Sequence, residues 1–249
     1  MGFLYKKLPF SHAQTRWAGK HYNWFSSDSS DVYQRNFYEK QSELADAGWD
    51  DPDQPIVYRF NKAGFRDDNF DNQPAGIALG CSLTFGVGVH EHCAWPQLLS
   101  EKLGMRVWNL GIAGGGQDVC FRVLDHMLDE LQPQFVIYQQ PSPWRWEFFD
   151  SEWKMVLAAH FGNIAEEFSP FVKTWFTHQE NIIAQGRRNM LAIRQRCHET
   201  NTPLFITQES INMDQRARDL QHPGPESLQK FTDYVYSQRH LYLGEQHES

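Results

Sequence analysis

The sequence predicts an α/β fold built on a mostly parallel sheet. Short apolar runs, the size of buried strands, alternate with amphipathic segments of ten residues or more. Connections of that length suit parallel strands joined by right-handed crossovers. The runs expected as strands of this sheet are residues 76–79, 105–110, 134–139 and 203–207. A further strand is expected to open the segment 56–66, before a turn.

The helices are expected from apolar spacing and from their end signals. Pro96 suits a first helical turn, because its missing N–H would have no partner there. Gly104 suits the left-handed residue that ends the same helix. The expected helices cover about residues 32–47, 95–103, 118–131, 177–200 and 224–239.

Composition suggests one main domain with additions at both ends. The predicted parts are an accessory extension, 1–55, the domain, 56–240, and a C-terminal tail, 241–249. The extension is expected to pack on the domain through aromatic residues, namely Trp17, Trp24 and Phe25. Within the domain, the aromatic-rich insertion 144–177 has two interpretations, a lid or wall for a substrate or the core of a subdomain.

Charge and cysteine usage exclude several classes of protein. The net charge of −8 opposes tight nucleic-acid binding, which needs clustered Lys and Arg. The four cysteines form no C-x-x-C pair, so reduced thiols are expected instead of disulfides. No apolar stretch has the length of a membrane span, and the first residues lack the apolar core of a signal peptide. We therefore expect a cytoplasmic protein.

Ser82 is a candidate nucleophile. It follows the apolar run 76–79, so it would lie at the carboxyl end of a strand, where open α/β sheets bind their ligands. The alternative is a serine that only caps the following turn. A thiol neighbour, Cys81, could be reactive, but a buried small residue is the preferred interpretation.

Asp219 and His222 are the candidate acid and base. Their spacing would place both side chains on the same side of one helical turn, so the carboxylate could hold one imidazole nitrogen. A serine hydroxyl needs such a base to become a nucleophile. Backbone N–H groups of Ser82 and Gly111 could then bind a developing oxyanion. The alternative for Asp219 and His222 is a surface ion pair at a helix start.

Three segments in this order resemble the first, second and fifth conserved blocks of the SGNH (GDSL-like) hydrolases. They are residues 80–89, 109–114 and 219–224, and the preceding 59–66 is similar to a stretch found upstream in that family. The resemblance implies a three-layer α/β/α, flavodoxin-like domain and ester hydrolysis. It also implies that Ser82 is the nucleophile.

The resemblance further implies roles for residues around that serine. His222 would be the base, Asp219 its orienting acid and Gly111 an oxyanion donor. Two positions depart from the family pattern. The usual aspartate before the serine is Cys81, and the Gly-x-Asn-Asp block is replaced by residues 140–143. The nearest polar replacements for its asparagine are Ser142 and Gln140.

The sequence therefore predicts a serine hydrolase that cleaves a carboxylic ester, of a small molecule or a glycan, through an acyl-enzyme and without a cofactor. The alternative is an inactive module of the same fold that binds a glycan or a protein partner. The sequence leaves the oligomeric state open. Two weaker candidates are a phosphate-binding loop at 111–116 and a metal site at His90, Glu91 and His92.

Overall fold

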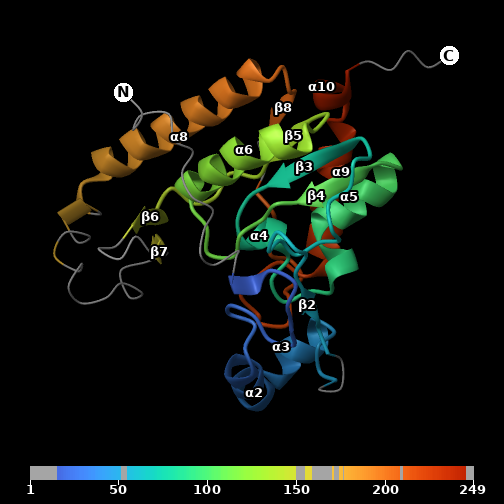
Figure 1. Ribbon diagram of the computed structural model, residues 1–249. Coiled ribbons are helices and arrows are strands. Elements are labelled where there is room, and N and C mark those ends of the chain that lie inside the picture. The colour runs from blue at the N-terminus through green and yellow to red at the C-terminus, as the bar shows by residue number, and fades with distance from the viewer. Residues whose placement is uncertain are drawn as a thin grey trace.

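The computed structural model describes residues 16–51, 55–149, 155–158, 170, 174–175, 177–207 and 210–244 (Figure 1). Its centre is a four-stranded sheet in the order β4-β3-β5-β8. All three pairings in this sheet are parallel, which confirms the predicted α/β class. The strands are β3 (Ala75–Leu79), β4 (Arg106–Asn109), β5 (Val136–Tyr138) and β8 (Leu204–Ile206).

Helices cover both faces of this sheet, so the domain has three layers (Figure 1). Helices α6 (Gln117–Leu131) and α8 (Gln179–Glu199) pack together on one face. Helices α5 (Trp95–Leu103) and α9 (Pro225–Ser237) pack together on the other. Alternate strand residues supply the two cores, because successive side chains of a strand point to opposite faces. Ile77 and Leu79 join the α6 side, and Ala78 joins the α5 side.

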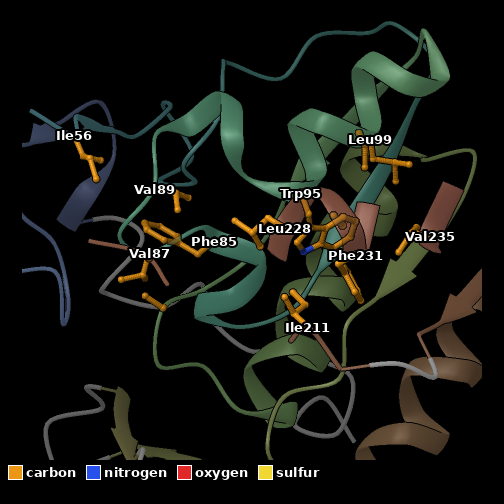
Figure 2. Close-up of a cluster of buried hydrophobic side chains, with 14 of the residues drawn as sticks. Ile56, Phe85, Val87, Val89, Trp95, Leu99, Ile211, Leu228, Phe231 and Val235 are labelled. Carbon is orange, nitrogen blue, oxygen red and sulfur yellow. The ribbon is translucent and has the colours of Figure 1, made fainter. Parts of the chain in front are cut away.

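Figure 2 shows part of the core on the α5 side. Trp95 and Leu99 of α5 meet Leu228, Phe231 and Val235 of α9, and all five side chains are buried. Helix α5 begins and ends where its signals predict, since Pro96 lies in its first turn and Gly104 is left-handed with φ +61°. This layer carries Ser82's neighbours, because the buried Phe85 and Val87 belong to the same cluster.

The N-terminal region differs from the prediction in two elements. The single helix expected at 32–47 is two helices, α2 (Ser30–Glu39) and α3 (Gln41–Asp46), because Lys40 leaves helical geometry with φ −137° and ψ 38°. The strand expected in 56–66 is only β2 (Tyr58–Arg59). It pairs antiparallel with β1 (His21–Tyr22) and stands outside the parallel sheet.

Residues of the predicted tail and of the predicted extension pack against the core of the domain. Helix α10 (His240–Leu243) overlaps the predicted tail, and its Tyr242 ring lies 4.9 Å from that of Phe135, centroid to centroid. Tyr242 is 1% exposed, so the core continues past residue 240. At the other end, Phe25 stacks on Phe85 with ring centroids 5.2 Å apart.

Part of the aromatic insertion is described. It contains an antiparallel pair, β6 (Trp146–Phe149) and β7 (Met155–Ala158), and most of its other residues lie outside the described ranges. Glu147 accepts hydrogen bonds from Arg122 of α6, with N–O distances of 3.1 to 3.3 Å, so the pair is anchored to the domain. None of the described helices combines the length and apolar character needed to cross a bilayer.

Candidate active site

Ser82 begins a four-residue helix, α4 (Ser82–Phe85), directly after the loop that leaves β3. Left-handed Gly86, with φ +80°, ends the helix after one turn. Ser82 is 3% exposed and lies at the carboxyl edge of the parallel sheet, as expected. Its N–H belongs to a first helical turn, where helical geometry offers no acceptor within the helix.

The structure brings Ser82, His222 and Asp219 together. The Ser82 hydroxyl lies 2.9 Å from Nε2 of His222. Nδ1 of the same ring lies 2.7 Å from Oδ2 of Asp219. A proton can therefore pass from the hydroxyl to an imidazole that a buried carboxylate holds in place.

Asp219 and His222 lie in a tight turn before α9, not on the helical turn that the sequence predicted. The N–H of Ala217 donates to the carbonyl of His222 at 2.8 Å and closes the turn. Leu220 has φ +55°, an uncommon left-handed conformation for this residue type. Oδ1 of Asp219 accepts the N–H groups of Gln221 and His222, each at 3.0 Å, so the backbone of the turn fixes the carboxylate.

The electrostatics of Asp219 favour its charged form. Burial, the largest single effect, opposes the charge, while the hydrogen bond and the electrostatic interaction with the His222 ring favour it. Hydrogen bonds from the Ser27 hydroxyl and the Gln221 N–H act in the same direction, and together these groups hold the pKa of Asp219 below its usual value. A charged Asp219 can stabilise an imidazolium formed on His222.

Ser27 is a site residue that the sequence analysis missed. Its hydroxyl donates to Oδ2 of Asp219 at 2.7 Å and lies 3.4 Å from Nδ1 of His222. Ser27 comes from the predicted accessory extension, inside the serine-rich run 26–30. No local pattern distinguishes it from the neighbouring serines, because its role depends on a contact with a residue 192 positions away.

A buried ion pair joins the same extension to the turn that carries Asp219. Asp28 accepts from Arg218 at 2.9 Å and 2.7 Å, and both side chains are almost fully buried. The Tyr58 hydroxyl donates to Asp28 at 2.5 Å and accepts the N–H of Gly88 at 2.8 Å. Burial, with the nearby Asp28 charge, raises the pKa of Tyr58 well above its usual value, so this phenol stays a donor.

Gly111 is placed differently from the predicted oxyanion donor. Its N–H donates to the Asn109 side chain at 3.0 Å, so that bond would have to be exchanged before Gly111 could bind an oxyanion. The need for glycine comes from packing, because a Cβ at position 111 would overlap the backbone of Thr84 and Phe85 in α4. Gly111 therefore sets how closely the loop after β4 approaches the helix of Ser82.

The structure does not bring Gln140 and Ser142 to the serine. Both are exposed, and no hydrogen bond joins either one to Ser82 or His222 in the parts of the chain that the structure describes. Gln140 instead lines a pocket of about 270 Å³ beside α8. The buried amide near the serine is Gln139, whose Oε1 lies 3.8 Å from Sγ of Cys81. Gln139 directly follows β5 and is 5% exposed.

The residues of the two weaker candidates, the metal site at 90–92 and the phosphate-binding loop at 111–116, make contacts within the protein. Glu91 pairs with Arg59 at 2.8 Å, and the rings of His90 and His92 stack with centroids 5.6 Å apart. Among the described residues, no group of three or more His, Cys, Asp or Glu side chains could hold a metal ion. The glycine-rich loop closes on itself, since the N–H of Gly115 donates to Ile112 at 2.9 Å.

This chain is similar to several solved structures at low sequence identity. No family model matches the chain, and no curated protein matches it. A psychrotrophic esterase EstA from Pseudoalteromonas sp. is 16% identical, with 67% of this chain and 96% of that chain covered and a TM-score of 0.37.

Two further structures are similar to this chain to the same degree. AlinE4, an SGNH-hydrolase family esterase, is 14% identical, with 68% of this chain and 75% of that chain covered and a TM-score of 0.37. A carbohydrate acetylesterase family member from Sinorhizobium meliloti is 13% identical, with 70% and 100% covered and a TM-score of 0.38.

Proposed function

We propose that this chain is a serine hydrolase of the SGNH type that cleaves a carboxylic ester through an acyl-enzyme on Ser82. One observation carries the proposal: a continuous hydrogen-bonded path runs from the Ser82 hydroxyl through His222 to Asp219, with distances of 2.9 and 2.7 Å. The burial of Ser82 and Asp219 adds support, because excluded water strengthens charge stabilisation within a site.

The reaction follows from these positions. The Ser82 oxygen attacks the ester carbonyl carbon while Nε2 of His222 takes the hydroxyl proton. The tetrahedral oxyanion collapses, and the leaving alcohol takes that proton from His222. Water then attacks the acyl-serine, again losing a proton to His222, and the carboxylic acid leaves as Ser82 recovers its hydrogen. These steps use protein groups and water, and Asp219 stays ionised throughout.

The substrate of this reaction is the ester of a small molecule or a glycan. The N–H of Ser82, in the first turn of α4, is the donor best supported for the oxyanion. Gly111 is a second donor once its bond to Asn109 opens. A missing third donor typically costs about 100-fold or more in rate, so we expect slow turnover of unactivated esters.

A second candidate function is an inactive module that holds a glycan or a protein partner on the same fold. The observation that favours it is the incomplete oxyanion site, since the Gly111 N–H is already engaged and Gln140 and Ser142 lie at the surface. The two functions differ in whether Ser82 is an activated nucleophile. Only an activated serine reacts rapidly with a fluorophosphonate.

The test compares the native chain with Ser82→Ala and with Ser237→Ala, which removes an exposed serine at the end of α9. We expect fluorophosphonate labelling and 4-nitrophenyl acetate turnover in the native chain and in Ser237→Ala, and neither in Ser82→Ala. Turnover that survives in Ser82→Ala would remove the mechanism. A native chain that resists labelling would favour the binding module.

A further inference from the structure

The strongest feature outside the Ser–His–Asp path is the contact between the N-terminal segment and the acid of that path. Oδ2 of Asp219 receives two donors, Nδ1 of His222 and the hydroxyl of Ser27, both at 2.7 Å. Oδ1 receives two backbone N–H groups. The carboxylate therefore has four donors, and only one of the two side-chain donors belongs to the predicted catalytic set.

The position of Ser27 is tightly specified by its neighbours. Phe25 and Asp28 exchange backbone hydrogen bonds of 2.9 and 3.2 Å across a tight turn, and Ser26 between them has φ +59°. Asp28 is fixed by its buried pair with Arg218, the residue before Asp219. The turn thus presents the Ser27 hydroxyl to Asp219 with little freedom to move.

The same turn also contacts the helix of the nucleophile. The Phe25 ring stacks on Phe85 of α4 at 5.2 Å, and Trp24 lies against the Arg218 guanidinium, 4.1 Å from ring centroid to Cζ. One segment of the extension therefore contacts both the nucleophile's helix and the acid's turn. The same segment places the Ser27 hydroxyl on Asp219.

We infer that Ser27 is a positioning residue of the ester hydrolase: its hydroxyl holds Oδ2 of Asp219 and limits how strongly that oxygen binds the His222 ring. This inference rests on the proposed function for its kinetic consequence. A donated O–H withdraws charge from the carboxylate oxygen, so His222 is held in place without being made too basic to return its proton to the leaving alcohol. The predicted accessory extension is then part of the catalytic apparatus.

The test substitutes Ser27→Ala and uses Ser29→Ala as the matched control. Ser29 lies two residues further on and caps α2 through the N–H of Val32 at 3.2 Å, so its loss perturbs the same segment without touching Asp219. In Ser27→Ala we expect kcat/KM for 4-nitrophenyl acetate to fall about tenfold, mainly through kcat, as for loss of one hydrogen bond to a charged group.

The pH profile separates positioning from a general loss of structure. Without the Ser27 hydroxyl, Oδ2 binds the imidazolium more strongly, so the acid limb of the kcat/KM profile moves to higher pH in Ser27→Ala. In Ser27→Thr, which keeps the hydroxyl, we expect the acid limb at the same pH as in the native chain. In Ser29→Ala we also expect the acid limb at its native pH. Two results would overturn the inference. One is a native kcat/KM together with an acid limb at its native pH in Ser27→Ala. The other is an acid limb that moves as far in Ser29→Ala as in Ser27→Ala.

A measurement that needs no turnover keeps this inference distinct from the proposed function. The proton between His222 Nδ1 and Asp219 gives a downfield NMR signal, and we expect it further downfield in Ser27→Ala because that bond becomes stronger. An unchanged signal overturns the role of Ser27 even in an active enzyme. Turnover that survives Ser82→Ala removes the hydrolase proposal, whereas a moved signal still supports the Ser27 contact.

Discussion

Gly111→Ala tests whether close packing of the loop after β4 on α4 sets the position of Ser82, the proposed nucleophile. An added Cβ would lie 2.8 Å from the carbonyl carbon of Thr84 and 2.9 Å from Cα of Phe85. These are backbone atoms of α4, so no side chain can rotate away to make room. The backbone of α4 or the loop that carries position 111 must move, so the distance between them increases.

The magnitude follows from the size of this overlap. Overpacking a tight site costs about 1–3 kcal/mol in the free energy of unfolding. Contact between carbon atoms is best near 3.5–4.0 Å, so relief requires a shift on the order of 1 Å. A misplacement of about that size costs about 100-fold in rate. We therefore expect Gly111→Ala to lose moderate stability and most of its activity.

Gly114→Ala is the matched control in the same loop. Gly114 has φ +79° and no neighbour within 4 Å of a built Cβ, so alanine there is strained but collides with nothing. A left-handed alanine costs roughly 1–2 kcal/mol, which matches the stability loss expected at position 111. The two variants should therefore differ in activity far more than in stability.

The assay combines urea unfolding, followed by tryptophan fluorescence, with 4-nitrophenyl acetate turnover well below the unfolding transition. We expect similar unfolding midpoints and about 100-fold lower kcat for Gly111→Ala than for Gly114→Ala. Activity of Gly111→Ala within threefold of the control would refute the claim that this contact positions α4.

Three further outcomes are expected. Asp28→Ala leaves Arg218 buried without its carboxylate, so the free energy of unfolding should fall by about 3–5 kcal/mol. The double variant Asp28→Ala with Arg218→Met should lose less, because no unpaired charge stays buried. Equal losses of stability in the single and double variants, measured by urea unfolding, would count against this explanation. Burial raises the pKa of the Asp67 carboxyl to about 7, above the 3.8 of an exposed one. The folded state then binds the extra proton, so stability should fall as pH rises from about 4 to about 7, and Asp67→Asn should flatten that slope in melts at several pH values. Tyr242→Ala should lower the free energy of unfolding by about 3 kcal/mol through loss of packing on Phe135. A loss under about 1 kcal/mol would mean that α10 contributes little to the core.

Local chemistry accounts for the elements that could be predicted. The period of apolar residues, the proline at 96 and the glycine at 104 act within one turn of chain, and the structure has a helix where they predict one. The alternation of strand and helix was enough to predict parallel pairing, which all three pairings of the central sheet confirm. The break at Lys40 was missed because no glycine or proline marks it.

The candidate site also contains residues that local motifs identify and residues that depend on contacts between distant segments. Ser82, Asp219 and His222 stand in short motifs whose spacing and order can be read along the chain, and the structure brings their side chains within hydrogen-bonding distance. Ser27 stands in no motif, and its neighbour is 192 residues distant. Gly111 was identified as an important position, but its N–H contacts a side chain that spacing alone does not orient.

Periodicity, end signals and motif order are properties of neighbours in the chain, so the α/β architecture and the three residues of the hydrogen-bonded path could be predicted from the sequence. The donors around Asp219, the closeness of Gly111 to α4 and the contact of Gln139 with Cys81 depend on how distant segments pack. Close packing and the pairing of most buried polar groups both need partners from distant parts of the chain, and those partners meet only once the surrounding layers are in place.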